Sequence, residues 1–372
     1  MRPIDELELL LRPAGGGVYL VSTGRAEQEA LQRTLYGLPQ SADESRIRAA
    51  WRASLDRIST AKIAILAVPS DVGAGFLRGA NMGPAGIRAA LHSDAAFTAR
   101  MEEEGIVDIG DVFVVPQLLH DEMLAPGQIG RTRAAIYPDA ALAEKEALPV
   151  SPLSIAERAM NLLFTINPNI RPFVIGGDHS CAWPVSAALA RHTKEPWAIV
   201  QIDAHTDMLE ERLGIQYCFA TWSFHASRLF DRADKMVQVG IRATRHERGH
   251  WEGKYGIRQF WAADCLANPT ASLDAIVAHV KTTGAKSIYF SNDIDGTDEK
   301  WADATGTPED RGLEPDFVAA LIVRLGKEFD LVAGDIMEVA PPIERTPGGR
   351  ERTLALANRY ARATLYAMKS PV

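Results

Sequence analysis

The chain has 372 residues, of which 47% are hydrophobic and 24% charged, an ordinary composition for a globular enzyme. Its formal net charge of -8 argues against a nucleic-acid partner, which needs a basic face, and no apolar run approaches the ~20 residues of a membrane-spanning helix. The three cysteines are too widely spaced for a disulfide framework. We therefore expect a cytoplasmic protein that binds neither nucleic acid nor membranes.

The chain divides near residue 60. Residues 1–60 are Gly-rich and then polar and helix-prone, and we expect an extension that packs on the core or on a neighbouring subunit. In residues 61–372 short apolar runs alternate with longer amphipathic ones, which predicts a single domain with a parallel sheet covered by helices on both faces. The predicted strands are Lys62–Val68, Pro172–Ile175, Trp197–Ile202, Met236–Ile241, Ser287–Ser291 and Leu331–Ile336. The predicted helices are Pro84–Leu91, Ile155–Leu163, Ala182–Arg191, Leu273–Thr282, Glu314–Lys327 and Arg352–Met368.

Three of these strands are followed directly by potential metal ligands. The first leads into Gly-Gly-Asp-His-Ser at residues 176–180, the second into Asp-Ala-His-Thr-Asp at 203–207, and the third into Asp293 and Asp295. Ligands bind at the carboxyl ends of the strands in sheets of this kind, so we expect the three clusters to meet there. A single Asp-x-His could equally be a cap or a turn, but three such clusters at three strand ends favour a site.

The spacing within the clusters indicates a cation. Asp203, His205 and Asp207 follow each other at every second residue, so extended chain points them to one side, and Asp293 and Asp295 repeat the arrangement. So many carboxylates in one small volume would repel each other unless cations were bound between them. Oxygen and imidazole ligands without thiolate favour Mn²⁺ or Ni²⁺. Two such ions can activate a water for attack on an electrophilic carbon.

With these three motifs in order, residues 62–370 resemble the ureohydrolase (arginase/agmatinase) family. Val68–Asp71, Asp108–Asp111 and Met337–Pro341 match further family segments. The resemblance implies an arginase-like α/β fold, a three-layer α/β/α sandwich with a mostly parallel central sheet, assembled into trimers or hexamers. It also implies two divalent ions, one held by His179, Asp203, Asp207 and Asp293, the other by Asp203, His205, Asp293 and Asp295. Glu338 would contact the substrate, and Asp178 would support His179 or the activated water, or simply form a turn.

The sequence departs from the family in two loops. Arginases and agmatinases have a proton-transferring histidine after the second motif, but this chain has Tyr217–Trp222 there. His225 is a candidate replacement, or an ordinary histidine on a helix face. The family's Thr-Gly-Thr-Pro-Glu core is kept at 305–309, where Thr305, Thr307 and Glu309 would bind the substrate. The altered approach brings Trp301, which would stack on a planar cation or pack under the loop.

These departures resemble the branch of guanidine hydrolases and bacterial metformin hydrolases, whose members resemble nickel enzymes. We therefore predict hydrolysis of guanidine or a small N-alkylated guanidine or biguanide, with Glu338 binding the cation and Asp207 stabilising the intermediate electrostatically. The first alternative is an agmatinase or a guanidino-acid hydrolase. The others are a polyamine or lysine deacetylase, which would use a single zinc, and a non-catalytic partner in a hetero-oligomer with an active paralogue.

Overall fold

The computed structural model describes residues 1–75, 77–141 and 145–369. Within these residues one nine-stranded sheet has the strand order β1-β3-β2-β4-β9-β8-β5-β6-β7. β1 runs antiparallel to β3, and the other neighbours pair in parallel. The strands are β1 (Leu11–Arg12), β2 (Ile63–Val68), β3 (Ile106–Val112), β4 (Arg171–Gly176), β5 (Trp197–Ile202), β6 (Met236–Ile241), β7 (Arg258–Trp261), β8 (Ser287–Asn292) and β9 (Asp330–Ile336).

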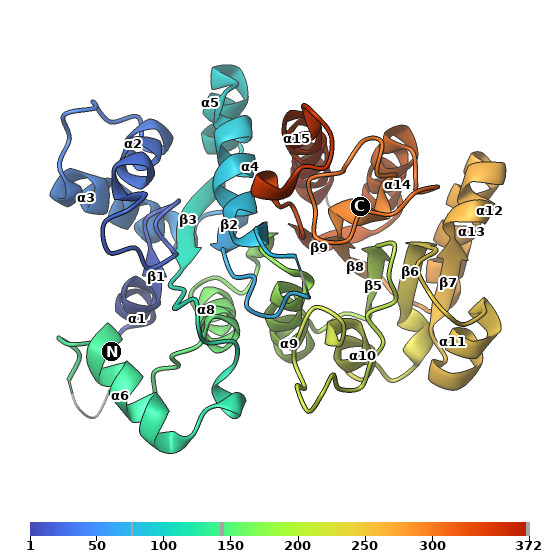
Figure 1. Cartoon of the computed structure of the whole chain (residues 1–372), viewed down its shortest axis with the longest axis horizontal. Coiled ribbons are helices and arrows are strands. Elements are labelled where there is room, and N and C mark those ends of the chain that lie inside the picture. The colour runs from blue at the N-terminus through green and yellow to red at the C-terminus, as the bar shows by residue number, and fades with distance from the viewer. Residues whose placement is uncertain (76, 142–144, 370–372) are drawn as a thin grey trace.

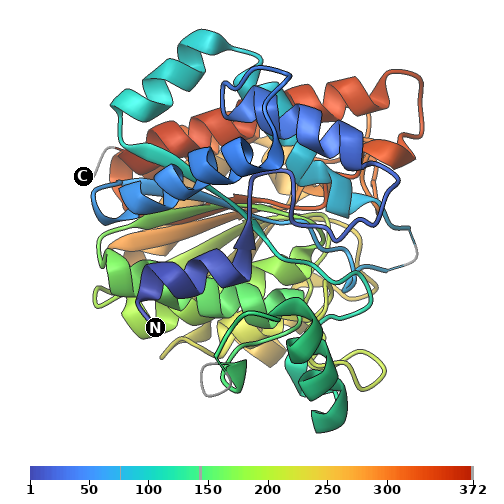
Figure 2. The same ribbon diagram turned by 90° about the vertical axis from the view of Figure 1, so that its left-hand side faces the viewer.

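Helices cover both faces of this sheet (Figures 1 and 2). In β2 the side chains alternate: Ala64 and Leu66 belong to the core on one face, Ile63 and Ile65 to the core on the other. The first core also takes in α1 (Pro3–Leu10), α3 (Glu44–Asp56), α8 (Pro152–Ile166), α9 (Ala182–His192), α10 (Trp222–Ser227) and α11 (Arg248–Tyr255). The second takes in α4 (Gly83–His92), α5 (Ala95–Glu103), α12 (Ala262–Ala267), α13 (Pro269–Thr282), α14 (Pro315–Glu328) and α15 (Gly349–Lys369). The predicted three-layer α/β/α architecture is therefore confirmed.

Every predicted strand and helix is present, with bounds that agree to within four residues, whereas β1, β3 and β7 were not predicted. β3 lacks a continuous apolar run because Asp108 and Asp111 interrupt it. Both carboxylates pair with Arg88 of α4, whose side chain is 1% exposed. A buried guanidinium between two carboxylates lets a charged sequence form an interior strand.

The first 60 residues are part of the same body as the sheet. β1 pairs with β3, and Leu7 and Trp51 are buried in the core on that face. α2 (Arg25–Leu35) also lies in this segment, while α6 (Pro126–Ile136) follows β3. The pairing requires glycine at position 110, where φ is 96° and a Cβ would lie 2.1 Å from the Arg12 carbonyl oxygen. The extension thus lies on its own core, and contact with a neighbouring subunit stays a prediction.

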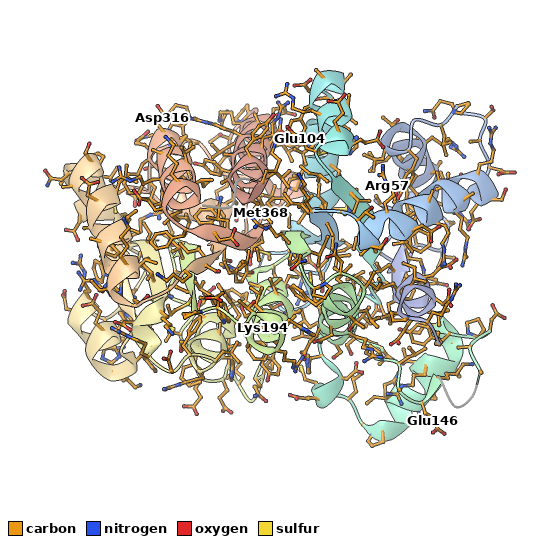
Figure 3. All side chains as sticks on the ribbon, turned by 180° about the vertical axis from the view of Figure 1, so that it is seen from behind. Arg57, Glu104, Glu146, Lys194, Asp316 and Met368 are labelled. Carbon is orange, nitrogen blue, oxygen red and sulfur yellow. The ribbon has the colours of Figure 1, made fainter. Side chains whose placement is uncertain are left out.

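Different residues lie at the amino and carboxyl ends of the parallel strands. Figure 3, seen from behind, labels Arg57, Glu104 and Lys194, which belong to the connections that lead into β2, β3 and β5. The motif residues follow the strands instead, so they lie at the opposite, carboxyl ends of the strands.

No helix among the described residues has the length and apolar character needed to cross a membrane.

Candidate metal centre

The three predicted clusters come together at the carboxyl ends of neighbouring strands. His179 begins a short 3-10 turn after β4, Asp203 directly follows β5, and Asp293 directly follows β8. The turn after β4 passes so close to the preceding loop that a Cβ on Gly177 would lie 1.9 Å from the Ser70 carbonyl oxygen. Glycine at this position therefore allows the tight turn that presents His179.

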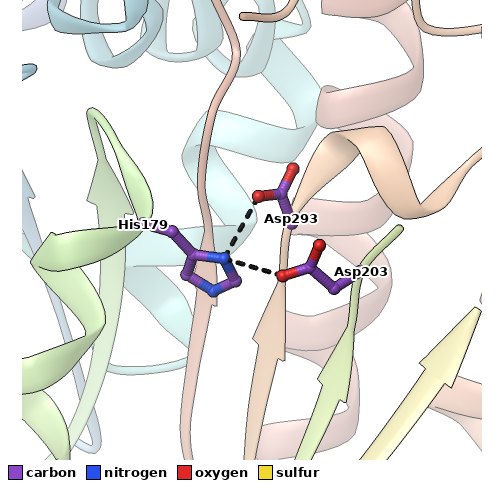
Figure 4. Close-up of side chains that lie close together, drawn as sticks. All are labelled: His179, Asp203 and Asp293. Atoms are coloured by element: carbon purple, nitrogen blue, oxygen red, sulfur yellow. Dashed lines mark ion pairs between the residues drawn. The ribbon is translucent and has the colours of Figure 1, made fainter. Parts of the chain in front are cut away.

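One group of ligands surrounds the Nδ1 atom of His179 (Figure 4). This atom lies 3.1 Å from Asp203 Oδ2, 3.1 Å from Asp293 Oδ2 and 3.3 Å from Asp207 Oδ2. All four side chains are buried. The set contains the four residues that the resemblance implies for one ion.

A second group lies beside the first and shares Asp203 with it. His205 Nδ1 is 3.1 Å from Asp295 Oδ2 and 3.6 Å from Asp203 Oδ1. One ligand atom from each of these three residues lies within 4.8 Å of the others. Asp203 thus has one oxygen toward each group, as a bridging ligand would. The corresponding bridging role of Asp293 stays a prediction, because its carboxylate clusters with His179 and Asp203 and not with the His205 and Asp295 side chains.

Burial and neighbouring charges raise the pKa values of two ligand carboxylates, Asp293 and Asp207. Burial, followed by the charges of Asp295 and Asp203, raises the pKa of Asp293 well above its ordinary value. Burial and then the charge of Asp203 raise the pKa of Asp207 to about 6. Burial opposes protonation of His179, yet the carboxylates that face its Nδ1 atom, Asp203 first, raise its pKa. The cluster therefore attracts positive charge.

The residues present are compatible with two divalent cations. His179 Nδ1 is fully buried and has no hydrogen bond of acceptable geometry, although three carboxylates surround it. An imidazole nitrogen facing carboxylate oxygens without a hydrogen bond is an arrangement that a cation would satisfy. The four carboxylates, when ionised, carry the charge that two divalent ions would balance.

Neighbouring side chains orient the ligands. The Nε2 atom of His179 lies 3.1 Å from Ser291 Oγ, so Nε2 can hold the ring proton while Nδ1 faces the carboxylates. Thr307 Oγ1 donates to Asp295 Oδ2 at 2.9 Å, and Glu309 Oε1 lies 3.8 Å from His205 Nε2. Thr307 and Glu309, predicted to bind substrate, are thus in contact with the second ligand group.

Sequence reasoning missed a chain of buried glutamines behind Asp203. Gln201 Nε2 donates to Asp203 Oδ2 at 2.7 Å, and Gln201 Oε1 accepts from Gln238 Nε2 at 2.9 Å. Gln238 Oε1 accepts in turn from Gln259 Nε2 at 2.8 Å. The three glutamines are paired in register on β5, β6 and β7. The sequence signal that could have revealed this chain is a glutamine within each of three otherwise apolar strands, since buried polar side chains need hydrogen-bond partners.

Glu338 and Asp207 are held in the left-handed backbone region, with φ of 63° and 51°. Glu338 Oε1 accepts from the His179 backbone N–H at 2.9 Å. Its Oε2 makes no hydrogen bond with the described residues and would lie 3.6 Å from a Cβ on Gly306. Non-glycine residues at positive φ are concentrated at functional sites. Glu338 therefore presents one free carboxylate oxygen between the ligands and the 305–309 loop.

The remaining predicted residues make no hydrogen bond or ion pair with the ligand side chains among the described residues. Thr305 is fully buried and bridges to Val339. Trp301 is 41% exposed, and its Nε1 donates to Glu314 Oε2 at 3.0 Å. His225 Nε2 lies 3.0 Å from the Glu210 carbonyl oxygen. The substrate role of Trp301 and the catalytic role of His225 stay predictions.

Asp178 makes the hydrogen bond of a turn residue, and its support of His179 or of the activated water stays a prediction. Its Oδ1 accepts from the Ser180 backbone N–H at 2.9 Å, at the start of the 3-10 turn His179–Cys181. Burial raises the pKa of Asp178 to about 6.

Comparison with known proteins gives a consistent result. The model of the arginase family matches residues 61–366. The chain belongs to the arginase family. It is 29% identical to the guanidinobutyrase of Pseudomonas aeruginosa over 305 residues, covering 79% of this chain and 82% of that protein. It is 27% identical to putative agmatinase 1 of Schizosaccharomyces pombe over 344 residues, covering 87% and 81%. The solved proclavaminate amidino hydrolase of Streptomyces clavuligerus superposes with a TM-score of 0.64 at 26% identity, covering 83% and 92%.

Family membership confirms the predicted enzyme class. The protein is an arginase-family hydrolase that acts on C–N bonds of amidines, in the class of guanidino compounds. The family depends on a binuclear metal centre, and the two ligand groups that share Asp203 are the residues that would hold it.

Proposed function

We propose that this protein hydrolyses guanidine or a small N-alkylated guanidine or biguanide such as metformin. The products would be urea or a substituted urea, with ammonia or an amine. The observation that carries this proposal is the free Oε2 of Glu338, which lies beside two carboxylate–histidine groups. A carboxylate oxygen at this place can accept a charge-assisted hydrogen bond from a guanidinium N–H.

The metal ions and the side chains around them would have different roles in the reaction. When bound, two Ni²⁺ or Mn²⁺ ions would supply Lewis acidity and would lower the pKa of a bound water toward neutrality. Glu338 would bind and orient the cation, so that its central carbon faces the ligand groups. Asp207 would stabilise positive charge that develops on the nitrogens, and Thr305, Thr307 and Glu309 would form the opposite wall.

Contacts at residues 73–75 support a small substrate. The Phe219 backbone N–H donates to the Gly73 carbonyl at 3.2 Å, and a Cβ on Gly75 would lie 3.1 Å from Phe219 Cζ. A Cβ on Gly73 would lie 2.7 Å from Ser180 Oγ. Phe219 and this loop therefore close tightly over the turn that carries His179, which favours a compact guanidino compound over one with a long tail.

A guanidino-acid hydrolase or an agmatinase is the second candidate. The relatives named guanidinobutyrase and putative agmatinase favour it, because they align with most of this chain. Such substrates have a four-carbon tail that needs room beyond the guanidino group. A substrate series therefore separates the two candidates.

The first experiment is to reconstitute the metal-free protein separately with Ni²⁺ and Mn²⁺ and to measure urea and ammonia release. The substrates are guanidine, methylguanidine, metformin, agmatine and 4-guanidinobutyrate. We expect turnover of the small or alkylated compounds with Ni²⁺. Turnover of agmatine or 4-guanidinobutyrate with Mn²⁺ would instead establish the second candidate.

Asp203→Asn is the control for this series. Because Asp203 belongs to both ligand groups, the substitution should abolish metal binding and lower turnover by at least about 10³-fold. A variant with full activity would overturn the proposed mechanism. A wild-type protein that binds both ions but releases nothing from any substrate would favour a non-catalytic partner of an active paralogue.

We further propose a cytoplasmic enzyme that assembles as a homohexamer or homotrimer, or with a paralogue. The three cysteines are buried and form no disulfide. That state agrees with a reducing compartment.

A further inference from the structure

The first turn of α10 contacts Asp207 in two ways. Trp222 Nε1 donates to Asp207 Oδ2 at 2.9 Å, and the Phe224 backbone N–H donates to the Asp207 carbonyl at 3.3 Å. Trp222 is completely buried, and its ring centroid lies 4.5 Å from that of His179 at an interplanar angle of 34°. One tryptophan side chain thus touches two members of the first ligand group.

These contacts act where the backbone of Asp207 needs support. Asp207 has a φ of 51°, in the left-handed region that residues other than glycine uncommonly adopt, although aspartate adopts it more readily than most. The indole N–H is a donor only, so it fixes one carboxylate oxygen in one direction. The oxygen it holds, Oδ2, is the one 3.3 Å from His179 Nδ1.

The second ligand group has different neighbours. Its Asp295 accepts from Thr307 Oγ1, and its His205 lies near Glu309. Among the described residues, Trp222 makes no hydrogen bond or ring contact with His205 or Asp295. The side-chain contacts of Trp222 are therefore confined to the first group.

We propose that Trp222 is a positioning residue for the ion held by His179, Asp203, Asp207 and Asp293, and not for the ion held with His205 and Asp295. The proposal rests on the proposed binuclear centre. Loss of a side chain that orients a metal ligand lowers metal affinity by about 10- to 100-fold. We expect a loss of this size at one of the two binding steps, with the other step unchanged.

The test compares metal binding by variants of the whole metal-free protein. Trp222→Phe keeps an aromatic ring over His179 but removes the donor. A second variant replaces Trp222 with its benzothienyl isostere, in which sulfur takes the place of the indole N–H and the shape is kept. Trp251→Phe is the matched control, because Trp251 is also buried and its Nε1 donates to a side chain, Thr244 Oγ1, at 3.0 Å. Ni²⁺ binding is followed by calorimetry, bound metal by mass spectrometry, and folding by circular dichroism.

Weakening of one step in the Trp222 variants, with both steps intact in Trp251→Phe, supports the proposal. Two unchanged steps in a folded Trp222 variant would overturn it, and so would equal weakening of both steps. If Trp222→Phe does not fold, the isostere decides. A wild-type protein that binds no ion would overturn the proposed function as well, whereas two normal steps in every variant would leave that function standing.

Discussion

His120 is a buried histidine outside the metal centre. Its ring is tilted by 50° against that of Tyr217, with centroids 4.8 Å apart, and its Nδ1 accepts from the Glu122 backbone N–H at 3.3 Å. An accepting Nδ1 requires a neutral ring whose proton is on Nε2. Burial, opposed by the charges of Glu122, Glu157 and Asp121, holds the pKa of His120 below its ordinary value.

This lowered pKa predicts acid sensitivity. Below about pH 6.5 the unfolded chain binds a proton at His120, whereas the folded protein binds it only at lower pH. The free energy of unfolding therefore decreases as the pH falls below about 6.5. His120→Asn keeps an acceptor but cannot titrate. Its free energy of unfolding in urea, measured at pH 7.5 and 5.5, should fall less than that of the wild type, by up to about 1.4 kcal/mol per pH unit. The exposed His246→Asn is the control, and an identical slope in all three proteins would contradict the prediction.

Single residues also show what sequence reasoning could reach. The metal ligands could be predicted because their spacing and residue types have a chemical meaning without knowledge of their neighbours. Gln201 could not, because its role depends on Gln238 and Gln259 lying beside it in the sheet, far away along the chain. The contact of Trp301 with Glu314 was likewise not predictable, because it joins the motif loop to the residue before α14.

At the scale of elements, strands buried on both faces were predictable and edge or charged strands were not. β5 and β8 are continuous buried runs, which is typical of the centre of a parallel sheet. β7 has four residues and lies at the edge, and β1 has two. β3 could not be predicted because its two aspartates interrupt the apolar run. The residue that pairs with them, Arg88, belongs to a helix elsewhere in the chain.

The pairing of β1 with β3 can be tested at Gly110. Gly110→Ala would place a Cβ 2.1 Å from the Arg12 carbonyl oxygen and would strain a φ of 96°. We expect a loss of more than about 1 kcal/mol in the free energy of unfolding and faster proteolysis within residues 1–60. Gly130→Ala in α6 is the control, because nothing lies within 4 Å of its added Cβ and a helix favours alanine. Equal proteolysis of the two variants would show that β1 does not anchor the extension.

At the scale of the whole molecule, the centre exists because the sheet brings distant segments together. β4, β9, β8 and β5 are consecutive in the sheet, although they are not consecutive in the chain. Each contributes a residue at its carboxyl end: His179, Glu338, Asp293 and Asp203. Such convergence follows from parallel pairing, so the location of the centre at the carboxyl ends of the strands could be predicted from sequence. The distances that divide the ligands into two overlapping groups could not be predicted.

This convergence of carboxylates predicts opposite effects of Asp293→Asn on the metal-free and metal-loaded protein. The raised pKa of Asp293, caused by burial and then by Asp295 and Asp203, means that its charge opposes folding at pH 7 when no cation is present. Removing that charge should therefore raise the Tm of the chelator-treated protein. With Ni²⁺ at 100 times its Kd, each bound ion stabilises the wild type by about 2.7 kcal/mol.

The variant should lose most of that gain, because Asp293 belongs to the first ligand group. The order of the two Tm values is thus expected to reverse when metal is added, as measured by calorimetric scans with and without chelator. Asp316→Asn, whose carboxylate is 91% exposed, should leave both Tm values within about 1 °C of the wild type. If metal raises the Tm of Asp293→Asn as much as that of the wild type, Asp293 is not a ligand. If the metal-free variant melts below the wild type, the buried carboxylates are not in net repulsion, and the electrostatic account of the centre is wrong.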